Sequence, residues 1–365
     1  MSFISNILIG VLTGYITLTN QLADKVLTLI PAGQQVESAQ LTDRPGDTPY
    51  RLPTQYNDTH TIPRILLENI RYQTATLRDS VEVNQFYTTN PIEALVNIFC
   101  TYRTDRFIRT TTGTGFFISP DGIILTNAHV AQFLLLEATT ESGTTDCIVR
   151  SGSPATPLYR ASLLYIPPSW IQQHAKTITQ ETPVGTGERD YALLYVQSSL
   201  TNNPMPARFP SLRINTEPIA RHAINTPVVA AGYPAADLRL GDTSVELLPR
   251  QANSSISRLY TFGSNLADVI SLRGSAVGQH GSSGGPILNE AGEVIGLITT
   301  RGDDQLDGQG SLRAITISYV DRTITQETGF NLEQSLGGDL PFRSKIFLDT
   351  LGPFLTAILA RELRN

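Results

Sequence analysis

Three separate segments place a histidine, an aspartate and a serine in settings that support nucleophilic acyl transfer. His129 follows residues 113–128, which read as a strand, a Pro-Asp-Gly turn and a second strand. Asp190 directly opens an apolar run, where a carboxylate is unusual unless it has a partner, and Ser283 lies in the glycine-rich segment 281–286. Acyl transfer at neutral pH needs a hydroxyl, a base that takes its proton, an acid that orients the base and donors for the oxyanion. We therefore predict that His129, Asp190 and Ser283 form a catalytic triad.

The segment 281–286 reads Gly-Ser-Ser-Gly-Gly-Pro, and its glycines permit backbone angles that larger residues resist. Such a loop can bring N–H groups together, so we expect Gly281 and Ser283 to donate to the oxyanion. Ser283 is favoured over Ser282 because it occupies the serine position of a Gly-x-Ser-Gly-Gly-Pro pattern. Taken alone, each segment has a simpler interpretation: a glycine-rich turn, a solvated aspartate, or a core or capping histidine. Their occurrence together favours the triad.

These segments most closely resemble the trypsin-like serine protease superfamily and, within it, the bacterial HtrA/Deg-type branch. The resemblance rests on T-N-A-H-V (126–130), D-Y-A-L-L (190–194) and G-S-S-G-G-P (281–286), and A-A-G-Y-P (230–234) resembles the turn that opens the second barrel of that branch. The similarity extends from residue 113 to residue 300. It implies an all-β core of two six-stranded antiparallel β-barrels with the active site between them. It also implies cleavage of polypeptide substrates without a metal or a cofactor.

The chain departs from that family in two places. Ser282 stands where digestive relatives have an aspartate and the HtrA branch has an asparagine, so activation by capture of a newly cut N-terminus is not expected. The stretch after Asp321 has a helical pattern and is too short for the PDZ domain that usually follows an HtrA protease. Peptide-gated regulation of the HtrA kind is therefore not expected.

The spacing of the family also implies the residues of the primary substrate pocket. Its base would involve Val277 and Gly278, and its opposite wall Thr299, Thr300 and Arg301. Val277 offers no carboxylate, so we expect a small or medium aliphatic P1 residue rather than arginine or lysine. Arg301 would narrow the pocket, attract acidic groups or point into solvent. Thr299 would hydrogen-bond the triad acid, as its counterpart does in relatives.

The composition argues against several other classes of protein. The chain has 365 residues, of which 40% are hydrophobic and 16% charged, as is ordinary for a globular protein with a sizeable core. A net charge of −6 argues against a nucleic-acid partner, because phosphate binding needs a basic face. No His-Glu-x-x-His motif or Cys/His cluster occurs, so neither a metal site nor a metallo- or cysteine protease is expected.

The chain contains two cysteines, Cys100 and Cys147, which fall in predicted strands on either side of His129. They could form one disulfide in an oxidising compartment or remain two small buried side chains. Their positions lead us to favour the disulfide.

The sequence pattern changes along the chain. Four parts are predicted: residues 1–30, either a membrane anchor or an amphipathic or buried helix; 31–90, a linker and helical extension; 91–321, the trypsin-like domain with barrels over 91–200 and 220–321; and 322–365, a C-terminal helical extension. The C-terminal helices would cover a barrel or mediate assembly into an oligomer. We expect an extracytoplasmic location, with membrane contact if the first segment is an anchor.

Short β-rich runs separated by glycine and proline predict two batches of strands within residues 91–321. The predicted strands are 95–102, 115–119, 122–126, 147–151, 161–166 and 191–196, then 228–232, 244–248, 254–262, 269–272, 286–288, 293–299 and 312–318. Helices are predicted over 64–81, over 169–179, and over 344–363 with a kink at residues 352–353.

Two functions are compatible with this sequence. The favoured one is an active serine endopeptidase, for which the HtrA resemblance implies a role in protein quality control. The alternative is a catalytically silent module that keeps the protease fold and binds unfolded chains, as a chaperone does.

Overall fold

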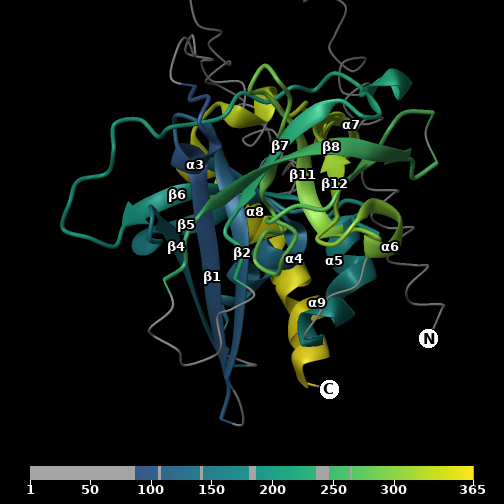
Figure 1. Cartoon of the computed structure of the whole chain (residues 1–365). Helices are drawn as coiled ribbons and strands as arrows, with labels where there is room; N and C mark the ends of the chain where they lie inside the picture. Colours follow the sequence, from purple (N-terminus) through teal and green to yellow (C-terminus); the bar gives the residue numbers. More distant parts are fainter. Residues whose placement is uncertain are drawn as a thin grey trace, which may run out of the picture. The chain divides into compact units, whose positions relative to one another are not determined.

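The computed structural model describes residues 87–364, apart from 106–107, 140–142, 181–185, 236–245 and 264. It contains two closed antiparallel β-barrels of six strands each (Figure 1). The first barrel contains, in spatial order, β1 (Leu95–Arg103), β2 (Ile108–Ser119), β3 (Ile123–Thr126), β6 (Ala192–Ser199), β5 (Thr156–Tyr165) and β4 (Thr144–Ser151). The second contains β10 (Pro286–Leu288), β11 (Val294–Arg301), β12 (Leu312–Thr316), β9 (Val269–Leu272), β8 (Arg250–Tyr260) and β7 (Pro227–Gly232). The predicted all-β core of two six-stranded barrels is confirmed.

The hairpin of β2 and β3 carries the chain toward His129. It closes on the predicted Pro-Asp-Gly turn, where the N–H of Gly122 donates to the carbonyl of Ser119 at 3.1 Å. Gly122 has φ +86°, which a residue with a side chain adopts only at a cost. All four residues of β3 are buried, so the strand that leads to His129 is fixed by the core on both faces.

Twelve of the predicted strands are present in the structure, and one prediction is wrong. The run over 244–248 alternates like a strand, but residues 246–248 form none. The carbonyl of Leu247 instead accepts a hydrogen bond from the N–H of Ala155, at 2.8 Å, in the turn between β4 and β5. The carbonyl of Leu247 is therefore bonded to the first barrel and not to a neighbouring strand of a sheet.

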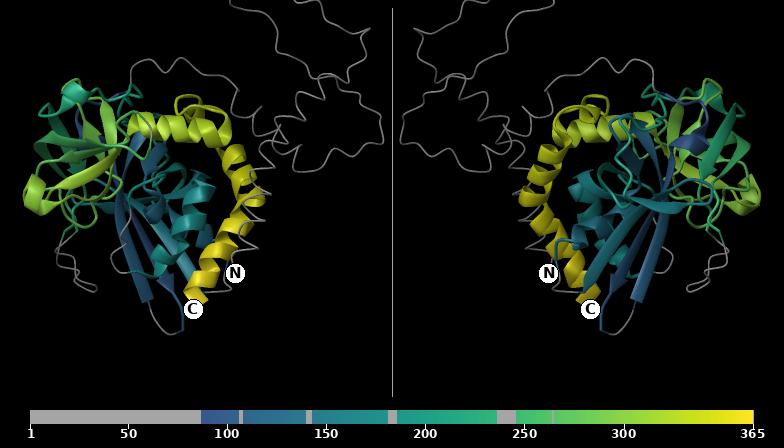
Figure 2. Two further views of the ribbon diagram at one scale, coloured as in Figure 1. Left: turned by 90° about the vertical axis from the view of Figure 1, so that its right-hand side faces the viewer. Right: turned by 90° about the vertical axis from the view of Figure 1, so that its left-hand side faces the viewer.

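Helices gather on one side of the first barrel, which the C-terminal helices partly encircle (Figure 2). The C-terminal helices are α7 (Ile317–Thr328), η5 (Gln334–Leu336), α8 (Leu340–Thr350) and α9 (Gly352–Arg364). The earlier helices are α3 (Pro91–Ala94), α4 (Ala128–Ala131), η2 (Gln132–Leu136), α5 (Pro168–His174), η3 (Ala175–Thr179), η4 (Arg221–Ala223) and α6 (Asp304–Asp307). α8 packs on β5 and α9 on η3, so the C-terminal helices cover the first barrel.

The predicted helices correspond to these elements with shifted ends. The prediction over 169–179 appears as α5 followed by η3, and the prediction over 344–363 appears as α8 and α9, which meet at Leu351 beside the predicted kink. Residue 321, the predicted end of the protease domain, lies inside α7. The domain limits themselves stay predictions.

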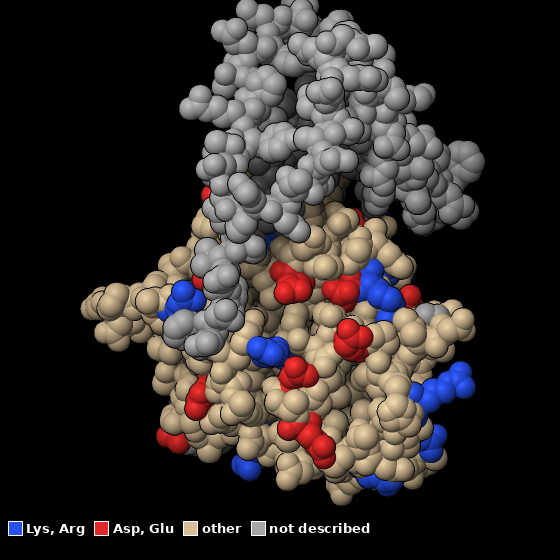
Figure 3. All heavy atoms as spheres, turned by 90° about the horizontal axis from the view of Figure 1, so that it is seen from above, with Lys and Arg blue, Asp and Glu red and all other residues tan. Residues whose placement is uncertain are grey.

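Acidic and basic side chains are interspersed on the face of the molecule that is seen from above (Figure 3). Among the described residues on this face, the basic side chains do not gather into one continuous area.

The predicted anchor or helix over 1–30, the helix over 64–81 and the rest of the predicted extension up to residue 86 lie outside the described residues. None of the helices in the described ranges is long and apolar enough to cross a membrane.

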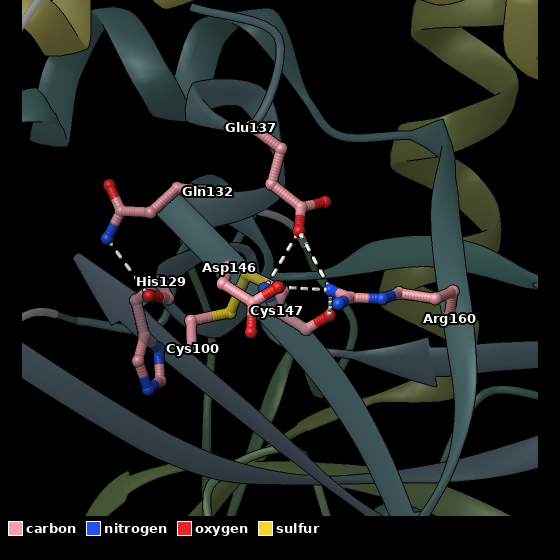
Figure 4. Close-up of a disulfide and its surroundings, with 7 residues drawn as sticks. All are labelled: Cys100, His129, Gln132, Glu137, Asp146, Cys147 and Arg160. Atoms are coloured by element: carbon pink, nitrogen blue, oxygen red, sulfur yellow. Dashed lines mark hydrogen bonds and ion pairs between the residues drawn. A yellow bond between two sulfur atoms is a disulfide. The ribbon is translucent and has the colours of Figure 1, made fainter. Parts of the chain in front are cut away.

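The two cysteines face each other across neighbouring strands of the first barrel. Cys100 of β1 and Cys147 of β4 are direct partners in the strand register and are joined by a disulfide (Figure 4). A carboxylate oxygen of Glu137 accepts the N–H of Cys147 at 2.8 Å and lies 3.8 Å from the guanidinium of Arg160. Of the two states considered for the cysteines, the structure contains the disulfide.

Glu137 makes the stability of this region depend on pH. Burial raises the pKa of Glu137 to about 7, although the N–H of Cys147 and the charge of Arg160 oppose the shift. The pKa of this carboxyl group is 4.5 in the unfolded chain and higher in the folded protein. Its contribution to the free energy of unfolding is therefore complete below a pH of 4.5 and is lost as the pH rises through about 7. The side chain is 29% exposed, so solvent screens part of this effect. We expect the free energy of unfolding to fall by about 2 kcal/mol, which is less than the whole pKa shift would give.

The measurement is urea unfolding of wild type and Glu137→Gln at about pH 5 and about pH 8 without reductant. Glutamine can still accept the N–H of Cys147, so the variant should lack this part of the pH dependence. Glu290 is exposed, and Glu290→Gln is the control that should retain the wild-type difference. Parallel pH curves for wild type and Glu137→Gln would contradict the prediction.

Candidate active site

His129 and Asp190 are joined by two hydrogen bonds. Nδ1 of the imidazole lies 2.7 Å from Oδ2 of Asp190, and the backbone N–H of His129 donates to Oδ1 of the same carboxylate at 2.9 Å. An ionised carboxylate can only accept, so the bond assigns the ring proton to Nδ1 and leaves Nε2 as the nitrogen that can accept a proton. This is the arrangement that a general base requires.

The backbone around Asp190 is also fixed. Its carbonyl accepts from the side-chain amide of Asn127 at 2.8 Å, and its N–H donates to the carbonyl of Gly187 at 3.1 Å. Asn127 is fully buried and precedes His129 by two residues, while Asp190 is 5% exposed. The segment that carries the imidazole and the segment that carries the carboxylate are therefore bonded to each other at side chain and backbone.

The loop with Ser283 depends on glycines at two positions. Gly281 has φ +90° and Gly284 has φ +88°, in the region that residues with side chains rarely adopt. A Cβ on Gly281 would lie 2.5 Å from the carbonyl oxygen of Tyr233. The N–H of Ser282 donates to the carbonyl of Gln279 at 3.3 Å, which closes a turn just before Ser283.

The two predicted oxyanion donors have fixed directions. The carbonyl of His280 accepts from the N–H of Ala235 at 2.6 Å, and the carbonyl of Ser282 accepts from the N–H of Gly285 at 2.9 Å. A trans peptide directs its C=O and N–H to opposite sides. The N–H groups of Gly281 and Ser283 therefore point away from those donors, and their role as oxyanion donors stays a prediction.

Thr114 of β2 links the serine loop to the strand that leads to His129. Its N–H donates to the carbonyl of Ser283 at 2.7 Å, and its hydroxyl donates to the carbonyl of Gly281 at 2.6 Å. Its own carbonyl accepts the hydroxyl of Thr126, three residues before His129, at 2.7 Å. The structure thus brings His129 and Asp190 into direct contact, and the buried Thr114 and Thr126 connect the backbone of the serine loop to the strand that leads to His129. A hydrogen bond between the hydroxyl of Ser283 and His129 stays a prediction.

Thr114 was not predicted to be a site residue, although it lies in the segment that leads to His129. It sits between Gly113 and Gly115, and a Cβ on Gly115 would lie 2.7 Å from a methyl group of Ile124. A fully buried threonine between two glycines in a strand is a signal of close backbone approach. That signal indicates crowding, but it does not identify the serine loop as the neighbour.

The residues predicted for the substrate pocket lie in different environments. Val277 is fully buried within the core of the second barrel, and Gly278 lies so close to the carbonyl of Gly310 that a Cβ would overlap it. The hydroxyl of Thr299 donates to the carbonyl of Arg313 at 3.3 Å, so its predicted bond to the triad acid stays a prediction.

The other two wall residues lie at the end of β11, opposite β12. Thr300 is a partner of Arg313 in the strand register, and Arg301 is a partner of Leu312. The side chain of Arg301 is 65% exposed and pairs with Asp304. The structure therefore favours the predicted orientation toward solvent, and the P1 preference stays a prediction.

Among the described residues, no group of three or more histidine, cysteine, aspartate or glutamate side chains could hold a metal ion.

The sequence model of the trypsin-like peptidase domain matches residues 113–297, just over half of the 365-residue chain. The matched solved structures include the Rv3671c protease from M. tuberculosis in its active form, with 20% identity, 72% of this chain and 88% of that chain covered, and a TM-score of 0.41. The inactive form of that protease matches with 21% identity, 68% and 96% coverage and a TM-score of 0.39. No curated protein matches the chain. Since the matched residues include His129, Asp190 and Ser283 and strands of both barrels, this chain belongs to the trypsin-like peptidase family.

Proposed function

We propose that this protein is a serine endopeptidase that cleaves polypeptides with Ser283 as nucleophile, His129 as general base and Asp190 as the acid that orients it. The observation that carries the proposal is the double hydrogen bond between Asp190 and His129, because it fixes the tautomer that can take a proton from a serine. The carboxylate is almost buried, so water competes little for it.

The proposed reaction proceeds through an acyl-enzyme. Oγ of Ser283 attacks the carbonyl carbon of the scissile peptide while Nε2 of His129 takes the hydroxyl proton, and the carboxylate of Asp190 stabilises the imidazolium. The N–H groups of Gly281 and Ser283 donate to the oxyanion of the tetrahedral intermediate. His129 then gives its proton to the leaving amine. In the second half, water replaces the amine, and the ester is hydrolysed to a carboxylic acid and free Ser283.

The finer assignment rests on the motifs. We propose membership of the HtrA/Deg-type branch, supported by T-N-A-H-V, D-Y-A-L-L and G-S-S-G-G-P, and a role in protein quality control. A disulfide between Cys100 and Cys147 supports an extracytoplasmic location, because disulfides persist in oxidising compartments. Polypeptides with a small or medium aliphatic P1 residue are the proposed substrates, and the interspersed charges of the face in Figure 3 give no support to a nucleic-acid partner.

The test is covalent labelling of the full chain with a fluorophosphonate probe, followed by mapping of the modified residue by mass spectrometry. We expect the label on Ser283, no label in Ser283→Ala and full labelling in Ser282→Ala, which is the matched control one residue away. Equal labelling of wild type and Ser283→Ala would overturn the assignment. A folded protein that resists the probe but binds unfolded chains would support the catalytically silent module instead.

A further inference from the structure

One face of α7 contacts the residues on both sides of Asp190. Tyr319, Thr323 and Glu327 are spaced by four residues, so their side chains lie above one another on the same side of the helix. Each makes a hydrogen bond or ion pair to Arg189 or to Tyr191, the two neighbours of Asp190 in the chain. The sequence predicted a strand for the first two residues of α7 and a C-terminal extension from residue 322, and no catalytic role was predicted for either.

Arg189 has an unfavourable backbone conformation that α7 supports. Its φ is +55°, in the left-handed region that costs free energy for a residue with a side chain. Its N–H donates to the hydroxyl oxygen of Tyr319 at 3.1 Å, and its guanidinium forms an ion pair with Glu327. Strained conformations persist where the surroundings over-determine them, and here the contacts come from α7.

Glu327 is itself firmly placed. Its Oε1 accepts from the hydroxyl of Ser169 at 2.8 Å as well as from Arg189, and its Oε2 accepts from the hydroxyl of Tyr165. The side chain is 15% exposed, so the charge-assisted bonds act with little competition from water. The carboxylate therefore joins α7 to β5, to α5 and to Arg189 of the Asp190 segment.

The residue after Asp190 is fixed from the same helix. Tyr191 is fully buried, and its hydroxyl is hydrogen-bonded to the hydroxyl of Thr323 at 3.0 Å. Its backbone N–H donates to the carbonyl of Arg189 at 3.0 Å, which closes the segment around Asp190. The position of the carboxylate is thus defined by contacts on both sides.

α7 is also attached to the second barrel. The helix begins directly after β12, and Arg322 pairs with Asp268, a residue that is 1% exposed and precedes β9. Figure 2 shows the C-terminal helices passing from the second barrel along the first. The helix therefore connects the barrel that carries Ser283 with the segment that carries Asp190.

We propose that α7 is a positioning element of the active site, in which Tyr319 and Glu327 fix Arg189 so that the carboxylate of Asp190 reaches both the N–H and the Nδ1 of His129. This inference rests on the proposed function of Asp190 as the triad acid. Tyr319 and Glu327 are bonded to Arg189, and they act through the segment 189–191. Catalysis by this chain thereby depends on a helix that lies outside both barrels.

The test compares Tyr319→Phe and Glu327→Gln with wild type in steady-state peptide hydrolysis. Both substitutions keep the side-chain volume, and each removes one group that fixes Arg189. We expect kcat to fall by about 10- to 100-fold with KM changed by less than about twofold, because a small displacement of a catalytic group costs rate rather than binding. The low-field NMR signal of the proton between His129 and Asp190 should shift or broaden in both variants.

Arg343→Met is the matched control for lost stability alone. Arg343 of α8 is 1% exposed and donates to the carbonyls of Ser335 and Gly337 at 2.9 and 2.5 Å, in the connection between α7 and α8. This variant should lower the melting temperature but leave kcat and the NMR signal unchanged. The same pattern in Tyr319→Phe and Glu327→Gln would overturn the positioning role.

The probe experiment separates the two proposals. If wild type labels on Ser283 while the α7 variants keep wild-type kcat, the positioning role fails and the endopeptidase assignment stands. If wild type does not label at all, the proposed function itself fails.

A double variant, Arg189→Met with Glu327→Gln, should be no slower than the slower single variant, because both changes remove the same contact.

Discussion

Ser283→Ala should lower kcat for peptide hydrolysis by about 10⁶-fold, and removing His129 from that variant should cost nothing further. The two side chains act as one unit, because the hydroxyl is a weak nucleophile without its base and the base has no proton to take without the hydroxyl. The measurement is kcat for wild type, both single alanine variants and the double variant on one peptide substrate. Losses that multiply in the double variant would contradict a shared catalytic step.

Asp190→Asn extends this series and should lower kcat by about 10⁴-fold, less than either alanine substitution. The structure gives the reason for a partial effect. An asparagine can still accept the backbone N–H of His129 through its amide oxygen, as Oδ1 of Asp190 does at 2.9 Å. Its amide nitrogen cannot accept from Nδ1, so the ring loses the partner that sets its tautomer. A loss as large as that of Ser283→Ala would mean that the segment had moved as a whole.

Many of the strands could be predicted because each one corresponds to a local pattern of apolar residues in the sequence. Alternating or continuous apolar runs between glycines and prolines predict strands, and twelve such runs became the twelve strands of the two barrels. The exception, 244–248, has the same pattern as the others. Its outcome depended on a hydrogen bond between Leu247 and Ala155, which lie far apart in the sequence, and no local pattern reports such a contact.

The part of the site that could be predicted is the part whose residues lie in recognisable sequence motifs. His129 and Asp190 meet as expected, since a strand exit and a strand entrance in one barrel place them at the same edge. The supporting contacts were not predictable, because Thr114 reaches Gly281 across 167 positions of sequence and α7 reaches Arg189 across 130. Such contacts depend on how two separate barrels dock, which is a property of the whole fold.

The start of α7 shows a second kind of limit. The sequence predicted a strand over 312–318, whereas β12 ends at Thr316 and the hydroxyl of Thr316 accepts the N–H of Tyr319 as a helix cap. Threonine suits both a strand and an N-cap, so local propensity could not locate the change. The three positions of α7 that contact the Asp190 segment all follow from that boundary.

Gly284→Ala should destabilise the fold by about 4 kcal/mol, the largest effect on stability that we expect from a single methyl group. Two costs add at this position. An alanine at φ +88° pays about 1–2 kcal/mol for its backbone conformation. Its Cβ would also overlap the carbonyl oxygen of Thr114 and lie 2.6 Å from the hydroxyl of Thr126. Relief of that overlap must break the hydrogen bonds that join the serine loop to β2, at about 1–3 kcal/mol for the groups left unsatisfied.

Gly292→Ala separates the two costs, because Gly292 shares the backbone conformation without the crowding. Its φ is +75°, and the nearest atoms to an added Cβ lie 3.8 Å away on Thr89. This variant should lose only about 1–2 kcal/mol in urea unfolding at neutral pH without reductant. The excess loss in Gly284→Ala then measures the contact between the serine loop and the first barrel. Equal losses in the two variants would show that the loop can move away from Thr114 at no cost, and the close junction of the two barrels at Ser283 would not be a requirement of the fold.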